Sequence, residues 1–272
     1  MTLVMGILNV TPDSFSDGGR FLTADAAIAQ GLELARQGAD IIDVGGESTR
    51  PGAERVEPGE EVERVLPVVE ALAAEGLTVS IDTMRARTAR AAVDAGARLV
   101  NDVSGGLADP DMARIVGELE CEYVAMHWRA HSPQMDATDA YRDVVAEVRD
   151  ELAARVDALV SAGVRPERIV LDPGLGFSKV TDSNWPLLAR MRDWAGDHRV
   201  LVGASRKRFL GAAIARDGVD AADPAAREHA TTAITALCAD RDVWAVRVHD
   251  ARAARDAVQV VSAWQNALDP EL

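Results

Sequence analysis

The sequence predicts one α/β domain, a (β/α)8 TIM barrel that spans residues 1–272. Eight short apolar segments alternate along the chain with amphipathic helical segments. The apolar segments are continuous runs of Val, Ile and Leu, which is typical of parallel strands covered by helices. A polar or charged residue follows each of the eight segments. In a closed barrel, all of these residues meet at one mouth, at the C-terminal ends of the strands.

Each element is read from its periodicity and its end signals. The strands are expected at residues 2–8, 41–44, 77–81, 99–100, 123–126, 169–171, 200–202 and 244–248. The helices are expected at residues 23–37, 60–74, 86–94, 110–119, 141–162, 185–194, 208–216, 224–239 and 251–267. Thr23 is the expected N-cap of the first helix. Gly38, Gly96 and Gly163 follow three of the helices, in the position where a glycine commonly ends a helix.

An open doubly wound sheet is the alternative architecture. Such a sheet binds ligands where its strand order reverses, so its polar residues would cluster after two or three strands. Here polar residues follow all eight strands, and 272 residues is a common length for a single α/β barrel. The closed barrel accounts for both observations.

Composition limits the classes of partner. The net charge is −15, which argues against a duplex nucleic-acid binder because that needs a broad basic face. A local basic cluster can still bind anionic substrates. No apolar run approaches the roughly 18 residues of a membrane span, and the first residues lack the features of a signal peptide. Cys121 and Cys238 are expected to be buried, reduced thiols, so a cytoplasmic location is expected.

The residues at the strand ends define a candidate site. They are Asn9, Asp43, Asp82, Asn101, His127, Asp172, Lys207, Arg247 and His249. Asp82, Asn101 and Asp172 would offer two carboxylates and an amide to one flat heterocycle, and Lys207 beside them would keep the acids ionised. Asp43 is expected to cap a helix or to accept buried hydrogen bonds. Metal binding by Asp and His is a weaker alternative, because no HxxxH or similar spacing appears.

A basic cluster follows the last two strands. Ser205, Arg206 and Lys207 come after the seventh strand, and Arg247 and His249 end the eighth. In barrels of this kind the loops after strands seven and eight commonly bind an anion. The alternative is that these charges only pair with neighbouring acids. Ser205 is not expected to be a nucleophile, because the chain has no G-x-S-x-G turn around it.

The strand-end motifs together resemble one known family. They read GILNVTPDSFSDGG, GADIIDVGGESTRPGA, SIDT, VNDVSGG, MH, LDPGLGF, GASRKRF and RVHD. In this order they are similar to the signature motifs of dihydropteroate synthases, above all those of the actinobacterial branch, over essentially the whole chain. The resemblance implies a barrel that joins 6-hydroxymethyl-7,8-dihydropterin diphosphate to p-aminobenzoate, a step of folate biosynthesis that sulfonamides target.

The resemblance also implies a role for each matching residue. The pterin would contact Asp82, Asn101, Asp172, Lys207, Met126, Phe177 and Gly203. The diphosphate would contact Asn9, Arg247 and His249, and Asn9 would also hold Mg²⁺, the implied cofactor. The p-aminobenzoate would contact Phe15, Thr49, Arg50, Pro51 and Ser205. Catalysis would depend on Asp82, Lys207, Asn9 and Asp172.

The resemblance implies small-molecule substrates and a homodimer, with no nucleic acid or membrane as partner. Two alternatives stay open at this point. One is a divergent pterin-binding paralogue without catalysis, in which the first loop would differ from the motif. The other is a pterin-dependent methyltransferase that acts with a corrinoid and has no use for the SRK motif at Ser205 or the p-aminobenzoate loops.

Overall fold

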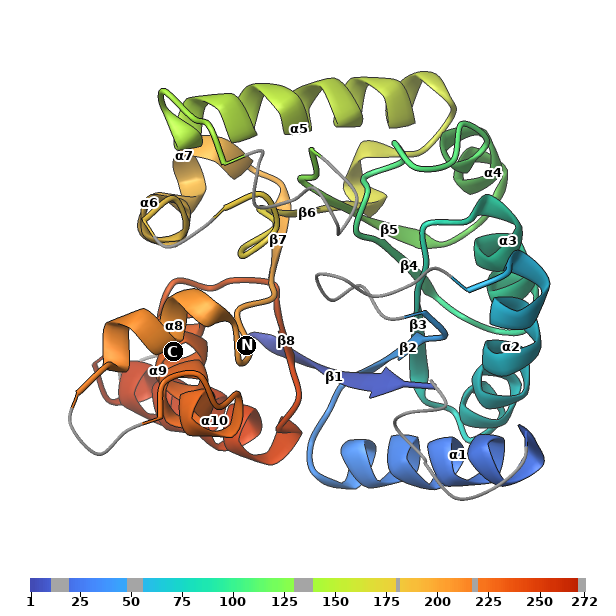
Figure 1. Cartoon of the computed structure of the whole chain (residues 1–272), viewed down its shortest axis with the longest axis horizontal. Helices are drawn as coiled ribbons and strands as arrows, with labels where there is room; N and C mark the ends of the chain where they lie inside the picture. The colour runs from blue at the N-terminus through green and yellow to red at the C-terminus, as the bar shows by residue number, and fades with distance from the viewer. Residues whose placement is uncertain (11–19, 48–55, 130–138, 180–181, 217–219, 269–272) are drawn as a thin grey trace.

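The chain folds as a closed parallel barrel. The structure, a computed structural model, describes residues 1–10, 20–47, 56–129, 139–179, 182–216 and 220–268. Each strand pairs with the next from β1 to β8, and β8 pairs with β1. Figure 1 looks into this ring and shows the helices arranged around its outside. The barrel prediction is confirmed, and the open sheet is excluded because its two edge strands would be unpaired.

The elements follow the predicted order closely. The strands are β1 (Leu3–Asn9), β2 (Ile41–Gly45), β3 (Thr78–Asp82), β4 (Leu99–Asp102), β5 (Glu122–Met126), β6 (Ile169–Asp172), β7 (Arg199–Val202) and β8 (Ala245–Val248). The helices are α1 (Arg20–Arg36), α2 (Pro58–Ala74), α3 (Ala86–Asp94), α4 (Met112–Glu118), α5 (Val144–Ser161), α6 (Asn184–Ala189), α7 (Met191–Ala195), α8 (Arg208–Ile214), α9 (Glu228–Asp240) and α10 (Ala251–Leu268). Short 3-10 turns, η3 (Pro166–Arg168) and η4 (Ala225–Arg227), precede β6 and α9.

Three of the predicted helix ends are confirmed, and the predicted N-cap of the first helix is wrong. Gly38, Gly96 and Gly163 have φ values of 101°, 112° and 101°, the left-handed conformation that ends a helix without strain only at glycine. Thr23 does not cap α1, because that helix begins at Arg20. Residues 20–22 contain no helix breaker, so the helix continues one turn further toward the N-terminus. The predicted helix at 185–194 is divided at Arg190 into α6 and α7.

Every strand contributes to an outer apolar layer, and every strand except β3 contributes to an inner one. The larger layer lies between the strands and the helices and includes Val4, Ile42 and Val100. A separate, smaller layer fills the barrel interior, and its members are Met5, Ile41, Leu99, Val124, Val170, Leu201 and Ala245. Successive side chains along a strand point to opposite faces. Because both faces are buried, the strands read as continuous apolar runs in the sequence.

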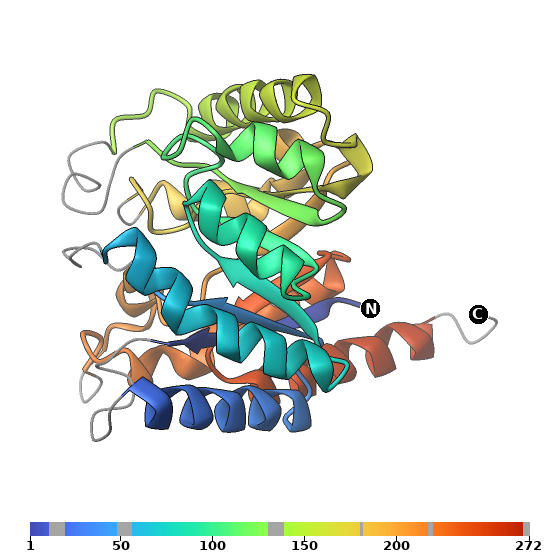
Figure 2. The same ribbon diagram turned by 90° about the vertical axis from the view of Figure 1, so that its right-hand side faces the viewer.

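The ends of the described chain lie at one side of the barrel. Figure 2 shows the N-terminus and the end of α10 on the same side, with α10 reaching beyond the other helices. In the part of the chain that the structure describes, none of the helices is both long and apolar enough to span a bilayer.

Candidate active site at the barrel mouth

The strand period places a second layer of side chains directly above the interior apolar layer. This layer lies two residues further along the strands, and we call it the mouth layer. Its members are Asp43, Asp82, Asn101, Met126, Asp172, Gly203 and Arg247. Asn9 follows four residues after Met5, and Asp82 ends β3 in register with Gly45 on one side and Asn101 on the other. These residues therefore share one face, the inside of the barrel. The predicted strand-end residue His127 does not join them, because it lies one position past Met126 and contacts Glu151 of α5 on the outside.

Arg247, near the C-terminus, bonds two acids of the mouth layer that come from the N-terminal third of the chain. Its Nε donates to Oδ2 of Asp43 over 2.6 Å, and its Nη2 donates to Oδ2 of Asp82 over 2.7 Å. Asn101 Nδ2 also donates to Oδ2 of Asp43, at 3.0 Å. All three partners are buried, with Asp43 at 0% and Asp82 at 5% exposure. Asp43 thus has the buried hydrogen-bonding role that was one of its two predicted roles.

Asp82 is only partly satisfied by these contacts. Among the described side chains, Oδ1 of Asp82 and Oδ1 of Asp43 are buried without a hydrogen-bond donor. Burial raises the pKa of Asp82 to about 7, although Arg247 opposes the rise and Asp43 adds to it. Lys207 was expected to keep the acids ionised, but the cation beside Asp82 is Arg247, and burial raises the pKa of Asp82 by more than Arg247 lowers it. A ligand that donates to Oδ1 would favour the carboxylate.

Asp172 and Lys207 face each other across the base of the loop that follows β6. The backbone N–H of Gly174 donates to Oδ1 of Asp172 over 2.7 Å, which orients the carboxylate. The Lys207 ammonium donates to the carbonyl of Leu175 and lies 4.7 Å from the ring centre of Phe177. Burial lowers the pKa of Lys207 to about 8, and Asp172 opposes this shift. Burial likewise raises the pKa of Asp172, against the effect of Lys207.

Gly203 keeps the floor of the mouth open. A Cβ added there would lie 3.7 Å from Oδ2 of Asp172, 3.9 Å from Nζ of Lys207 and 4.0 Å from Cβ of Arg247. These are ordinary van der Waals distances, so any side chain at this position would occupy the space between the three charged groups. Met126, at 3% exposure, belongs to the same layer.

Ser205 and His249 form a pair at the rim. Ser205 Oγ lies 2.9 Å from Nδ1 of His249, and the backbone N–H of His249 donates to the same oxygen at 3.2 Å. The pair ties the loop after β7 to the end of β8. The resemblance placed Ser205 with the p-aminobenzoate and His249 with the diphosphate, whereas the structure brings the two side chains into direct contact.

The first two loops fall outside the described residues. They carry Phe15, Thr49, Arg50 and Pro51 of the predicted site. The ends of the second loop are described, and Arg85 holds both of them. Its Nη1 pairs with Glu47 at 2.7 Å, and its Nη2 donates to the carbonyl of Val56 at 2.5 Å. Inspection of the strand ends did not find this role for Arg85, because Arg85 lies three residues past the end of β3.

Asn9 offers a single amide to a metal ion. It ends β1 beside Gly45 and is partly exposed. Within the described ranges, no three His, Cys, Asp or Glu side chains gather closely enough to hold a metal. Mg²⁺ commonly takes one or two protein ligands and completes its shell with water and substrate phosphates. The donor set at this mouth therefore fits an ion that the substrate brings, rather than one held in a protein cage.

Comparison with known proteins agrees with this geometry. The family described as pterin binding enzyme matches residues 5–249. Dihydropteroate synthase of Mycobacterium leprae is 55% identical over 268 residues, which cover 97% of this chain and 94% of that protein. A structure of the Xanthomonas albilineans dihydropteroate synthase in complex with 7,8-dihydropteroate superposes with a TM-score of 0.85 at 41% identity, covering 97% of this chain and 94% of the other. The Yersinia pestis enzyme in a sulfonamide drug complex gives a TM-score of 0.88 at 34% identity, over 97% and 94%.

A closed barrel with buried acids, an amide and a lysine at its mouth, matched by this family over nearly its whole length, is a pterin-binding enzyme. The similarity to the M. leprae and X. albilineans proteins then decides the branch. The chain belongs to the dihydropteroate synthase family and is a transferase of folate biosynthesis.

Proposed function

We propose that this mouth joins 6-hydroxymethyl-7,8-dihydropterin diphosphate to p-aminobenzoate through the residues described above. The observation that carries the assignment is the buried cluster of Asp82, Asp43, Asn101 and Arg247, with one oxygen of Asp82 left without a donor. A pterin edge carries N–H groups that can donate to such an oxygen. The X. albilineans relative, whose structure contains 7,8-dihydropteroate, supports the same choice of ligand.

The pterin is assigned to a position between two groups of mouth-layer residues. Asp82 and Asn101 contact it on one side, and Asp172 and Lys207 on the other. Met126 and Phe177 line its faces, and Gly203 leaves the room for it. The surroundings of Gly203 support this assignment, because a Cβ placed there would be in van der Waals contact with both Asp172 and Lys207.

The chemistry is the exchange of one bond at the pterin methylene carbon. The bond from this carbon to the diphosphate oxygen breaks, and its electron pair leaves with the diphosphate. The methylene cation that results is attacked by the neutral amine of p-aminobenzoate, which then loses a proton. A carboxylate at Asp82 stabilises the developing positive charge, and such pre-oriented groups typically contribute about 3–4 kcal/mol each.

The leaving diphosphate is assigned to Arg247, His249 and Asn9. Arg247 can present its planar fork to two phosphate oxygens, which a lysine cannot do. Mg²⁺, when bound with the substrate at Asn9, would neutralise part of the diphosphate charge. The p-aminobenzoate is assigned to Ser205 at the rim and to Phe15, Thr49, Arg50 and Pro51 of the first two loops. The sulfonamide drug complex of the Y. pestis relative supports sulfonamides as ligands of this chain.

We also assign the chain to a homodimer in the cytoplasm. Four apolar side chains are exposed on the adjacent helices α9 and α10, namely Leu237 (56%), Val260 (69%), Trp264 (67%) and Leu268 (72%). The last three are four residues apart and so share one helix face, which a second copy would bury. The two cysteines are buried and free, in keeping with a reducing compartment. Light scattering of the protein and of a Trp264→Ser variant tests the dimer.

The function is tested by an assay of diphosphate release. Release should require both pterin diphosphate and p-aminobenzoate, and dihydropteroate should form in equal amount. A protein that binds pterin but releases no diphosphate is the non-catalytic paralogue. A protein that instead binds methyltetrahydrofolate and accepts a corrinoid partner is the methyltransferase.

The assignment of Arg247 has its own measurement. Titration calorimetry with free diphosphate should show that Arg247→Ala weakens binding by about 2–4 kcal/mol, the range for truncating a buried charged partner. Because Arg247 also bonds Asp82, the variant should weaken binding of the pterin without diphosphate as well, though by less. Unchanged diphosphate affinity would move the anion site to Ser205 and Arg206.

A further inference from the structure

The chain contains only two lysines, and both contact the same loop. Of its 29 basic residues, 27 are arginines, and the lysines are Lys179 and Lys207. The shared loop comprises residues 173–178 after β6. Lys207 contacts it from the inside of the barrel, through the carbonyl of Leu175 and the ring of Phe177. Lys179 contacts it from the outer side of the barrel wall. All other basic side chains among these 29 are arginines, so a side-chain ammonium group occurs only at these two positions.

The Lys179 ammonium has three acceptors around a single nitrogen. Nζ donates to the carbonyls of Phe177 at 3.0 Å and Gly174 at 3.2 Å, and it lies 2.9 Å from Nδ1 of His127. The residue is 3% exposed. Three donors that radiate from one atom match these acceptors, whereas the planar fork of an arginine spreads its donors over three atoms. The site therefore requires lysine for a geometric reason.

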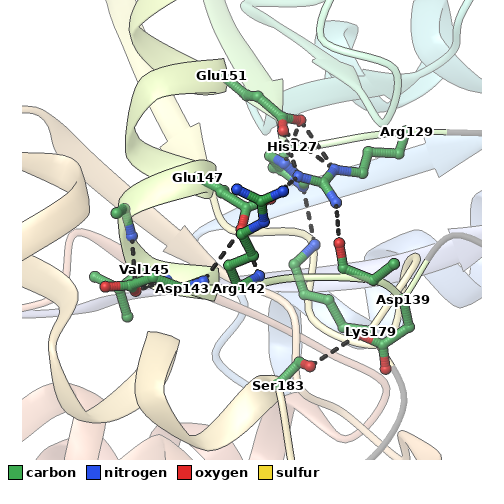
Figure 3. A network of polar contacts seen from close by, with 12 residues as sticks. His127, Arg129, Asp139, Arg142, Asp143, Val145, Glu147, Glu151, Lys179 and Ser183 are labelled. Atoms are coloured by element: carbon green, nitrogen blue, oxygen red, sulfur yellow. Dashed lines mark hydrogen bonds and ion pairs between the residues drawn. The ribbon is translucent and has the colours of Figure 1, made fainter.

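His127 is fixed in the state that accepts from Lys179. Its Nε2 lies 2.9 Å from Oε2 of Glu151, and a carboxylate can only accept, so Nε2 carries the proton. Burial lowers the pKa of His127 to about 4, so the ring is neutral and Nδ1 is an acceptor. Arg129 holds Glu151 in turn and lies 3.9 Å from the ring centre of Tyr141. Figure 3 shows this chain of contacts running from α5 through His127 to Lys179.

Opposing neighbours set the charge of Lys179. Burial lowers its pKa to about 7, and Lys207 and Arg129 act in the same direction. Asp172 and Glu151 favour the ammonium form. A neutral amine has two N–H groups and would leave one of the three acceptors without a donor. The contacts around Nζ are thus complete only in the protonated form.

The loop that Lys179 holds carries two groups of the active site. The N–H of Gly174 orients the Asp172 carboxylate, and the carbonyl of Leu175 accepts from Lys207. The loop has little room to shift, because a Cβ at Gly174 would lie 2.3 Å from the carbonyl oxygen of His127. Its position against β5 therefore determines where the Asp172 carboxylate and the Lys207 ammonium lie.

We propose that Lys179 is a positioning residue for the transfer reaction. Held by His127, its ammonium fixes the loop at 173–178 and thereby sets Asp172 and Lys207 at the spacing that the pterin requires. The proposal rests on the proposed assignment of Asp172 and Lys207 to the pterin. Lys179 itself lies behind the loop and touches no substrate.

The first test compares Lys179→Met with Arg114→Met. Methionine has similar length and no donor. Arg114 pairs on the surface with Asp111 at 3.1 Å and Glu118 at 2.9 Å, so its variant loses the same charge far from the mouth. Lys179→Met should raise the KM for pterin diphosphate about 5- to 100-fold, the effect of leaving buried acceptors unpaired. The KM for p-aminobenzoate should stay within about twofold, and Arg114→Met should resemble the wild type.

The second test uses two replacements of His127. Asparagine places its carbonyl near the position of Nδ1 and keeps an acceptor for Lys179, whereas glutamine reaches toward Glu151 and loses that acceptor. His127→Gln should therefore raise the KM for the pterin, and His127→Asn should restore much of the wild-type value. In protein labelled with ¹⁵N-lysine, only two side-chain signals exist. The Lys207 signal should move in His127→Gln and remain near its wild-type position in His127→Asn.

Several outcomes would overturn the proposal. One is a Lys179→Met protein with the wild-type KM for pterin diphosphate. Another is equal loss with both substrates together with a lower melting temperature, which indicates a purely structural role. If Lys179→Met does not fold, equal behaviour of the two His127 variants rejects the proposal. A wild-type protein that releases no diphosphate would instead reject the proposed function, so the two failures are distinguishable.

Discussion

Two buried aspartates on neighbouring strands, Asp82 on β3 and Asp102 on β4, lie on opposite faces of the barrel wall. Asp102 points outward and accepts four hydrogen bonds, from the N–H and hydroxyl of Ser104, the N–H of Gly106 and the hydroxyl of Tyr123, at 2.7–2.9 Å. Asp82 points inward, accepts from Arg247 on one oxygen and has no donor on the other among the described residues. Both are almost fully buried.

The difference between Asp102 and Asp82 distinguishes a residue that stabilises the fold from one that can bind a substrate. Burial raises the pKa of both carboxyls, but at Asp102 four local donors oppose the rise, and they come from the chain itself. Asp102 on the outer face therefore has its hydrogen bonds complete without a ligand. Glu61 of α2, in the helix layer outside the strands, is similar, since Thr83, Thr88 and Arg85 all donate to it. The inner face keeps its charges incompletely paired, as expected of groups that a substrate will complete.

The strongest test of this contrast is Asp82→Asn. The substitution keeps the shape and removes the charge, so kcat/KM should fall about 10²- to 10³-fold. The melting temperature should stay close to that of the wild type or rise, because a poorly satisfied buried carboxyl is replaced by a neutral group. Measured together, diphosphate release and thermal unfolding decide the matter. An active Asp82→Asn enzyme would remove this residue from the mechanism.

The matched change on the outer face is Asp102→Asn. It turns two acceptor oxygens into one and sets an amide N–H₂ against existing donors, so the free energy of unfolding should fall by about 1–3 kcal/mol. Activity per folded molecule should be unchanged, because Asp102 faces the helix layer. Denaturant titration and active-site titration give the two quantities. Lost activity in a stably folded variant would contradict the separation of the two faces. Tyr123→Phe, which removes one of the four donors, is the milder control.

The smallest expected effect is on the pH profile. With pKa values of about 7 at Asp82 and about 8 at Lys207, kcat/KM should rise as Asp82 ionises and fall as Lys207 loses its proton. Since Arg247 lowers the pKa of Asp82, Arg247→Gln should move the acidic limb to higher pH. One ionisation changes kcat/KM by roughly tenfold per pH unit on its limb of the profile. A kcat/KM that does not change between pH 6 and pH 9 would exclude both groups.

The same shift of Asp82 affects stability, with a definite sign. In the unfolded chain the carboxyl has its ordinary pKa of 3.8, whereas the folded chain keeps the proton up to about pH 7. Between these values the folded state binds more protons than the unfolded state. The contribution of Asp82 to the free energy of unfolding therefore falls as the pH rises through this window. Asp82→Asn should flatten that part of the stability curve.

Much of the fold followed from periodicity, and part of the site from strand ends. The continuous apolar runs predicted all eight strands, and the residues after them predicted the mouth layer, including Asp82, Asn101 and Asp172. The pairing of Arg247 with Asp82 was not predictable, because it spans 165 residues and depends on the barrel register. The structure therefore revises the expectation that Arg247 serves the diphosphate alone.

Lys179 shows a different limit. It lies seven residues past the end of β6, so a search of strand ends does not reach it. Its partner His127, one residue past β5, and Glu151 of α5, which in turn contacts His127, come from distant parts of the chain. One signal was present, namely the rarity of lysine in a chain rich in arginine. That signal acquires meaning only when the structure shows what surrounds the ammonium.

The rarity of lysine has a practical consequence. Only two peptide bonds of the chain follow a lysine, and both belong to the loops at the mouth of the barrel. A lysine-specific endoprotease can therefore cut the folded chain only in the segments that follow β6 and β7. Its cleavage rate reports how often this edge of the barrel opens, while the arginine-rich remainder gives no background. Digestion of this protein with a lysine-specific endoprotease therefore measures local opening of these two segments.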